Sequence, residues 1–224
     1  MCGGASDLRD KWKEMNKEEQ TILASKIGDN NMSKKYGFVI DLRKCTGCYG
    51  CQSSCKMENK VPMGVNRATV FIKDAGTFPE NKRFFLPVLC NHCENPSCIK
   101  ACPVPGATLK RADGTVLVDH DKCVGCGYCA AACPYGARFM NPATGKADKC
   151  TWCVHRLDAG LEEPACVRNC KGSARYFGDL NNPDSSVSRL IAESKDRIKV
   201  RKEEFGTKPQ AFYIIDNRTK LDVE

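Results

Sequence analysis

Sixteen of the 17 cysteines in the chain fall into four groups of four, and this grouping is the strongest chemical signal in the sequence. Every group begins with two cysteines that are separated by two residues and ends with two that are separated by three. The groups are Cys45, Cys48, Cys51 and Cys55; Cys90, Cys93, Cys98 and Cys102; Cys123, Cys126, Cys129 and Cys133; and Cys150, Cys153, Cys166 and Cys170. Disulfide bonds do not require such clustering, whereas metal centres do.

The spacing within the groups suits cubane clusters of iron and sulfide. Three cysteines at short intervals let a loop wrap three corners of a [4Fe–4S] cubane, and the last two cysteines share one face of a helical turn. In two-cluster ferredoxins, the fourth cysteine of each run binds the other cluster, which locks two loops into one unit. Pro103 and Pro134, directly after the second and third groups, add to the likeness to a ferredoxin run.

Zinc is the main alternative for paired cysteines. Structural zinc takes two pairs that are separated by a dozen or more residues, and only the fourth group, between Cys153 and Cys166, approaches that pattern. The sequence therefore favours four [4Fe–4S] clusters on sixteen cysteines. His92 and His155 adjoin cysteines, but no group lacks a cysteine, so we expect both to be hydrogen-bonding neighbours of the sites rather than iron ligands.

Basic residues accompany the cysteines, and the formal net charge is +8 when every thiol is counted as neutral. Sixteen thiolates and four oxidised cubanes bring the loaded protein to about zero, which argues against a nucleic-acid-binding surface. Lys44, Lys122 and Lys149 precede three of the groups, and a cation beside a cluster favours its reduced form. The aromatic residues expected to shield the sites from water are Tyr49, Tyr128 and Trp152.

Short strands and cysteine loops alternate over residues 36–180. Apolar runs precede cysteine groups at 36–41, 84–89 and 115–119, and similar segments follow groups at 106–109, 136–139 and 173–176. Asp113 and Gly114 predict a hairpin turn. The pattern further predicts helix over 6–27, a helix over 185–194 and an extended arm over 211–215.

The sequence contains no catalytic constellation: it has no phosphate loop, no nucleophile with a base and no dinucleotide fingerprint. It has no run of 18 apolar residues, so we expect no membrane span, and residues 1–31 lack a secretory signal. Cys2 is expected to be an ordinary free cysteine, with lipidation as the alternative. These features predict a redox protein that is not an enzyme on its own.

Longer segments around the cysteines carry a closer resemblance. They are Ile40–Cys45, Cys55–Asn59, Leu89–Pro96, Cys133–Arg138, Asp148–Leu157, Phe177–Leu180 and Gly206–Pro209. Through them the chain resembles the four-cluster iron–sulfur subunit of dimethyl sulfoxide reductase-type molybdopterin oxidoreductases, most of all the polysulfide, tetrathionate and thiosulfate reductase subunits. The resemblance covers roughly residues 36–215. Lys56 and Lys171 depart from a simple ferredoxin run, which has proline at those positions.

In that family the first cysteine group pairs with the fourth and the second with the third. The resemblance therefore implies four ligand sets. They are Cys45, Cys48, Cys51 and Cys170; Cys150, Cys153, Cys166 and Cys55; Cys90, Cys93, Cys98 and Cys133; and Cys123, Cys126, Cys129 and Cys102. It also implies that the Cys45 set faces a large molybdopterin catalytic subunit and that the Cys150 set faces a quinone-reactive integral membrane subunit.

The function implied is electron relay between those two partners in a respiratory oxidoreductase of polysulfide, tetrathionate or thiosulfate. The complex would be membrane-associated, on the periplasmic face of a prokaryotic cell. Two alternatives stay open. One is the same role in an arsenate, selenate or dimethyl sulfoxide type reductase, and the other is a polyferredoxin that acts alone.

The fold class expected is α+β, loop-rich, with short β-hairpins and an N-terminal helical extension. Its body would consist of two intertwined bacterial-ferredoxin-like units with two clusters each. The extension covers residues 1–35. One unit combines residues 36–89 with 145–182, the second covers 90–144, and residues 183–224 form a C-terminal helix and tail.

Overall fold

The computed structural model describes residues 34–216, so Cys2 and the helix expected over residues 6–27 lie outside the described residues. The strands are β1 (Tyr36–Asp41), β2 (Ala68–Ala75), β3 (Lys82–Leu89), β4 (Thr108–Lys110), β5 (Val116–Val118), β6 (Arg138–Met140), β7 (Ala147–Lys149), β8 (Arg175–Asp179), β9 (Ile198–Lys199) and β10 (Ala211–Ile214). The helices are α3 (Gly50–Asn59), α4 (Ser97–Lys100), α5 (Tyr128–Ala131), α6 (Val154–Asp158), α7 (Ala165–Arg168), α8 (Ser186–Glu193) and the 3-10 helix η1 (Glu203–Phe205). The described chain is thus mixed α and β and rich in loops, as expected.

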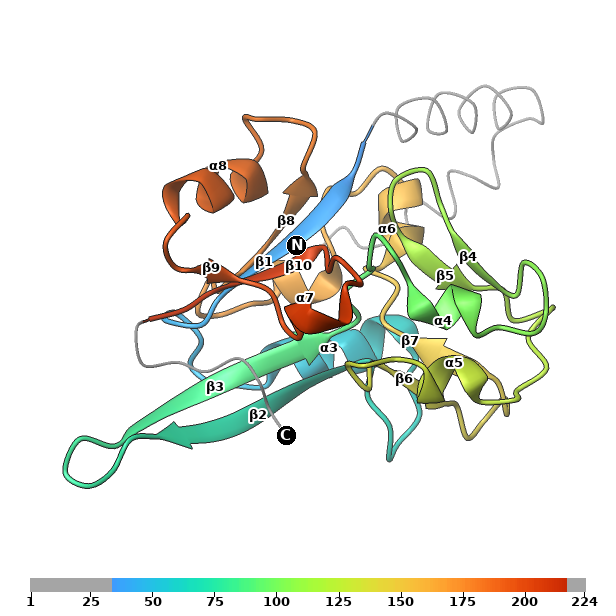
Figure 1. Cartoon of the computed structure of the whole chain (residues 1–224), viewed down its shortest axis with the longest axis horizontal. Helices are drawn as coiled ribbons and strands as arrows, with labels where there is room; N and C mark the ends of the chain where they lie inside the picture. The colour runs from blue at the N-terminus through green and yellow to red at the C-terminus, as the bar shows by residue number, and fades with distance from the viewer. Residues whose placement is uncertain (1–33, 217–224) are drawn as a thin grey trace, which may run out of the picture.

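A four-stranded sheet in the order β8-β1-β10-β9 joins segments from both ends of the described chain (Figure 1). Strand β1 pairs antiparallel with β8, where Phe38 lies opposite Phe177, and parallel with β10, where Phe38 lies opposite Ala211. The extended conformation expected over residues 211–215 is confirmed, but the segment is not a free arm. Ala211, Tyr213 and Ile214 are fully buried in the sheet.

The two faces of this sheet are both covered, which explains why every residue of β1 is buried. Val39 and Ile214 pack on one face against Val187 of α8. Phe38 and other side chains on the opposite face join the main core. Helix α8 confirms the helix expected over residues 185–194, and the Ser185 hydroxyl caps it by accepting a bond from the Ser188 N–H at 3.1 Å.

Three antiparallel hairpins complete the strands: β2–β3, β4–β5 and β6–β7. The predicted turn at Asp113 and Gly114 is confirmed between β4 and β5, where the Gly114 N–H bonds to the Arg111 carbonyl oxygen. The hairpin β2–β3 projects from the body as a long ribbon (Figure 1). Its strand β3 contains the apolar run expected over 84–89, whereas β2 was not predicted.

Helices contain the third cysteine of each group, and α3 also contains the fourth cysteine of the first group. Helix α3 packs against α7, and α4 packs against α5, so the helices form two pairs. The elements from β4 to β7 gather on one side of the molecule, away from the central sheet and α8 (Figure 1). Within residues 34–216, no helix is both long enough and apolar enough to cross a bilayer.

Candidate metal centres

Four cavities lie among the cysteine loops, and each is lined by four cysteines. We number them I to IV. Cavity I is lined by Cys45, Cys48, Cys51 and Cys170; cavity II by Cys55, Cys150, Cys153 and Cys166; cavity III by Cys90, Cys93, Cys98 and Cys133; and cavity IV by Cys102, Cys123, Cys126 and Cys129. The space among the side chains of each cavity, together with its opening to solvent, amounts to about 310 to 350 Å³. The structure therefore brings together, cavity by cavity, the cysteines that the family resemblance assigns to one cluster.

Helix α3 shows how one cysteine group contributes to two cavities. Its Cys51 and Cys55 lie one turn apart on the same face, yet Cys51 lines cavity I and Cys55 lines cavity II. Helix α7 does the converse, because Cys166 lines cavity II while Cys170, just beyond the helix, lines cavity I. The packed helices α3 and α7 thus hold cavities I and II as a pair.

Cavities III and IV repeat this arrangement with α4 and α5. Cys98 of α4 lines cavity III and the following Cys102 lines cavity IV, while Cys129 of α5 lines cavity IV and Cys133 lines cavity III. The loops reach these positions through left-handed backbone. Gly127, directly before α5, has φ of 78°, a conformation that glycine adopts without steric cost.

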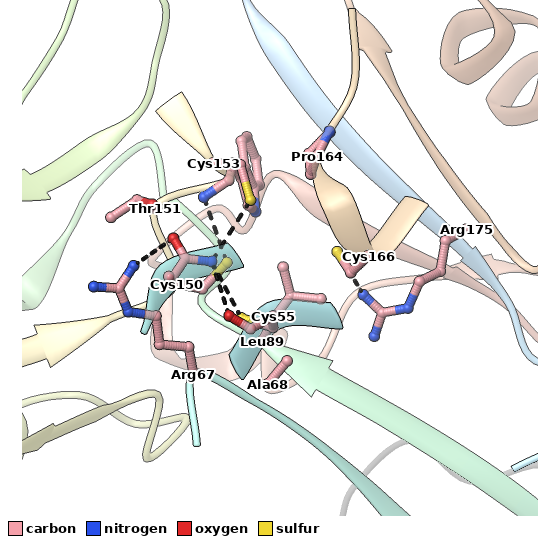
Figure 2. A pocket seen from close by; sticks show the side chains of 12 residues that line it. Cys55, Arg67, Ala68, Leu89, Cys150, Thr151, Cys153, Pro164, Cys166 and Arg175 are labelled. Atoms are coloured by element: carbon pink, nitrogen blue, oxygen red, sulfur yellow. Dashed lines mark hydrogen bonds between the residues drawn. The ribbon is translucent and has the colours of Figure 1, made fainter. Parts of the chain in front are cut away.

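Hydrogen bonds connect several of the residues that line cavity II (Figure 2). The Asn59 side-chain amide, at the end of α3, donates to the Cys55 carbonyl oxygen at 3.1 Å and lies 3.7 Å from Cys55 Sγ and 3.8 Å from Cys153 Sγ. Arg67 donates to the Asn59 side-chain oxygen at 2.9 Å and forms an ion pair with Asp148, also at 2.9 Å. These bonds fix the loops around the sulfurs.

The donor set fits a bound iron–sulfur cluster. Burial raises the pKa of the Cys55 and Cys93 thiols to about 12 and that of Cys166 to about 11. Such buried thiolates form at neutral pH only when a strong positive charge compensates them, and iron supplies it. Among residues 34–216, no three His, Cys, Asp or Glu side chains converge on a single ion position. The cysteines of a cavity are therefore not placed around a single ion as the ligands of structural zinc are, which disfavours the zinc alternative.

The three lysines singled out from the sequence lie in different environments. Lys149 is buried, and its ammonium group donates to the carbonyl oxygens of Val116 and, at 2.8 Å, of Cys150. Lys44 is exposed and bonds to the Tyr176 hydroxyl at 2.7 Å, and Lys122 is exposed beside Asp119. Of these lysines, Lys149 alone places a buried cation among the cysteine loops.

Two buried arginines that the sequence reasoning missed lie next to the cysteines. Arg138 donates to Cys98 Sγ at 3.1 Å, and Arg175 donates to Cys166 Sγ at 3.4 Å. Burial lowers the pKa of both guanidinium groups, but the neighbouring cysteine sulfurs raise it by more, so both pKa values lie above the ordinary one. A signal was available, because each arginine follows the last cysteine of its group by five residues.

The histidines lie where the sequence analysis expects hydrogen-bonding neighbours. His92 is fully buried, with Nδ1 accepting from the Val116 N–H at 2.9 Å and Nε2 lying 3.0 Å from the Cys150 carbonyl oxygen. Both ring nitrogens are therefore engaged by backbone groups and neither is open to iron. His155 Nε2 lies 2.8 Å from a Glu58 carboxylate oxygen.

The remaining expected neighbours differ in how they relate to the cavities. Trp152 is buried and lines cavity II, and Tyr49 lines cavity I. Tyr128 is 62% exposed and is not among the residues that line cavity IV. Pro134 lines cavity III, whereas Pro103 is exposed.

One shared lining residue and two direct contacts place the cavities in the order I, II, III, IV. Arg175 lines both I and II, Trp152 of cavity II stacks on His92 of cavity III, and Arg138 of cavity III bonds to Thr108 of cavity IV. Among the described residues, the two exposed cysteines are Cys48 and Cys126, which lie at the two ends of this row.

The position of cavity II in this row does not favour the expectation that the Cys150 set faces a membrane subunit. All four cysteines of cavity II are buried, and the cavity lies inside the row because one helix pair holds it beside cavity I while His92 joins it to cavity III. The end opposite cavity I is cavity IV, where the exposed Cys126 lies near Val124, which is 69% exposed.

Comparisons with known proteins support the presence of 4Fe-4S clusters. Residues 81–180 match the 4Fe-4S dicluster domain family. The chain is 50% identical over 183 residues to a tetrathionate reductase subunit of Salmonella typhimurium, covering 80% of this chain and 72% of that protein. It is 41% identical to a polysulfide reductase chain of Wolinella succinogenes, covering 85% of this chain and 100% of that protein. A putative dimethyl sulfoxide reductase iron–sulfur subunit of Halobacterium salinarum is 44% identical, with 80% and 78% covered.

The fold and the cysteine sets define a ferredoxin-type electron-transfer protein that carries 4Fe-4S clusters. Within that class, this protein belongs to the family of iron–sulfur subunits of dimethyl sulfoxide reductase-type oxidoreductases, which includes the tetrathionate and polysulfide reductase subunits. The expectation of a redox subunit that is not catalytic on its own is confirmed.

Proposed function

We propose that the chain holds four [4Fe–4S] clusters, one in each of cavities I to IV, on the sixteen cysteines that line them. The observation that carries the proposal is the grouping of four cysteines around each of four cavities of similar volume. Bound clusters supply reversible one-electron chemistry. The two helix pairs, each sharing cysteines between two cavities, form two intertwined ferredoxin-like units.

The protein's own contribution is to hold the sites close together and largely dry. The cysteines of cavity II are all buried, and Trp152 and Leu89 close its lining with apolar surface. Backbone and side-chain donors, such as the Asn59 amide, approach the sulfurs and favour their thiolate form. Among the described residues, the exposed cysteines are Cys48 and Cys126, one at each end of the row.

The exposed ends suggest where partners dock. The chain relays electrons between a molybdopterin catalytic subunit and a quinone-reactive membrane subunit, with cavity I facing the first and cavity IV facing the second. The names of the relatives support a multisubunit reductase, since each is called a subunit or a chain of a reductase. The complex is membrane-associated through its partners, on the periplasmic face.

The substrate we propose for the complex is a sulfur compound, with tetrathionate ahead of polysulfide and thiosulfate. The 50% identity to a tetrathionate reductase subunit supports this order, compared with 41% to a polysulfide reductase chain. The catalytic chemistry resides in the partner chain, so this assignment depends on the partner.

Purification of the complex through a tag on this chain tests the relay. We expect a large pterin-containing subunit and a membrane subunit to co-purify, and quinol to reduce tetrathionate in the purified complex. Replacement of Cys126 by alanine should abolish quinol-linked reduction while a soluble dye still drives the catalytic subunit. A chain that purifies alone with its clusters, and never with a pterin subunit, would contradict the relay and favour a soluble polyferredoxin.

A further inference from the structure

Arg175 and Arg138 are buried arginines that each lie against both cavities of one pair, Arg175 by lining both and Arg138 by lining one and bonding to a residue of the other. Arg175 lines cavity I and cavity II and donates to Cys166 Sγ in cavity II at 3.4 Å. Arg138 lines cavity III, donates to Cys98 Sγ there at 3.1 Å, and donates to the Thr108 hydroxyl of cavity IV at 3.3 Å. Each guanidinium therefore reaches toward two neighbouring sites.

The repeat is present in the sequence as well as in space. Arg175 follows Cys170 by five residues and begins β8, and Arg138 follows Cys133 by five residues and begins β6. In both pairs, a turn follows the last cysteine of the group and leads into a strand, and the arginine is the first residue of that strand. Both arginines are buried, with exposed fractions of 4% and 6%.

Ion pairs with carboxylates do not account for the burial of these two guanidinium groups. The two guanidinium groups donate to cysteine sulfur and to the Thr108 hydroxyl, and neither arginine forms a carboxylate ion pair among residues 34–216. Nη2 of Arg175 is buried and has no hydrogen-bond acceptor within the described residues. A buried cation with an unused N–H group fits an anionic, sulfur-rich group in the adjoining cavities.

We propose that each arginine is a positive charge shared by two neighbouring clusters, Arg175 by those of cavities I and II and Arg138 by those of cavities III and IV. This rests on the proposed occupancy of the cavities. Guanidinium suits the role because it stays charged when buried and its planar fork presents N–H groups to two sides. A shared cation favours the reduced form of both clusters, so it raises both reduction potentials together.

The junction between the pairs carries a separate buried cation, Lys149, which donates to the carbonyl oxygens of Val116 in cavity III and Cys150 in cavity II. Because each arginine contacts the cavities of its own pair, its loss should act selectively on that pair. Between cavities II and III lies the stack of His92 and Trp152, whose ring nitrogens carry no net charge in this hydrogen-bond arrangement. Loss of Arg138 should therefore lower the potentials of the clusters in cavities III and IV, and loss of Arg175 should lower those of cavities I and II. Each arginine therefore acts through its charge on the reduction potentials of two clusters and is not an iron ligand itself.

The test is an EPR-monitored redox titration of the purified complex that carries Arg138→Gln or Arg175→Gln. Each variant should retain the wild-type iron and sulfide content and show two lowered midpoint potentials, with the other two unchanged. Arg138→Lys and Arg175→Lys should restore much of the shift, because charge is kept. Arg83→Gln is the matched control, since Arg83 is an exposed arginine paired with Asp74 on the hairpin, and it should shift none.

Full iron content with unchanged potentials, or with a shift of one cluster only, would overturn the shared charge while leaving the four-cluster proposal intact. A wild-type protein without clusters would instead overturn the proposed function itself. If the glutamine variants lose iron, pulsed EPR on wild-type protein labelled with ¹⁵N-arginine decides the question. We expect guanidinium nitrogen couplings on both clusters of a pair, lost in the lysine variants, and their absence from either cluster would refute sharing.

Discussion

The His92 imidazole stacks on the Trp152 indole with ring centroids 4.0 Å apart and planes 24° from parallel. This contact joins cavity III, which His92 lines, to cavity II, which Trp152 lines. Burial, followed by the nearby Lys149 charge, holds the pKa of His92 well below its usual value. The two cysteine units therefore meet through a neutral, fully buried aromatic pair.

Loss of the indole should loosen this junction. Trp152 also packs against Phe38 and Phe177, and truncation of a buried tryptophan to alanine costs about 3–5 kcal/mol. We expect Trp152→Ala to bleach near 400 nm faster than wild type in denaturant under anaerobic conditions, with Trp152→Phe intermediate. The control is Phe205→Ala at a side chain that is 57% exposed, and equal bleaching rates in all variants would refute the packing role.

The sharing of cysteines between cavities can be tested by pairing substitutions. Cys55 lies in the first group, but it lines the same cavity as Cys153 of the fourth group. Cys55→Ala with Cys153→Ala should therefore cost one cluster, leaving about twelve irons, because both changes strike one site. The control Cys51→Ala with Cys153→Ala strikes two cavities and should leave about eight. The same iron loss in both double variants would show that the assignment of Cys55 is wrong.

Glycines in the third cysteine loop differ in how much space surrounds them. Gly125 has φ of 73°, and a Cβ there would collide with the Gly145 carbonyl oxygen, whereas a Cβ on Gly127 meets no atom within 4 Å. Gly127→Ala should cost only the backbone strain, about 1 kcal/mol, and keep the cluster of cavity IV. Gly125→Ala should lose that cluster, as EPR spin counting would reveal, and the opposite ranking would contradict the loop geometry.

Acid should weaken the central sheet through Asp41. This buried carboxyl group bonds to the Arg43 guanidinium at 2.7 and 2.8 Å, and although burial raises its pKa, those bonds lower it by more. Because the folded-state pKa lies below the unfolded value, Asp41 stabilises the fold above about pH 4 and loses this effect as the pH falls further. Asp41→Asn should unfold more readily at pH 7, by tryptophan fluorescence in denaturant, and its difference from wild type should shrink toward about pH 3. A difference independent of pH would exclude this ion pair as the cause.

Local pattern was enough to predict much of the fold. Apolar runs and a turn signal located β1, β5 and the hairpin at Asp113, and the apolar face of residues 185–194 located α8. Strand β2 was missed because no cysteine group follows it to mark a repeat. The burial of β10 was missed because its parallel pairing with β1 joins residues more than 170 positions apart.

For the site as well, local sequence predicted some features, whereas contacts between distant residues could not be predicted from it. Cysteine spacing defined the groups, and the family resemblance supplied their pairing, which spacing alone leaves open. Arg138 and Arg175 escaped notice because each lies outside its cysteine group in a short apolar segment that reads as a strand. The contact that matters for Arg138 is with Cys98, forty residues earlier in the chain, and no local pattern contains that information.

Chemical analysis of iron and acid-labile sulfide in the anaerobically purified, intact chain addresses the central claim most directly. Four cubanes require about sixteen atoms of each per chain, together with a broad absorption band near 400 nm. A colourless protein that contains zinc, or one with far less iron and no labile sulfide, would contradict the occupancy of all four cavities.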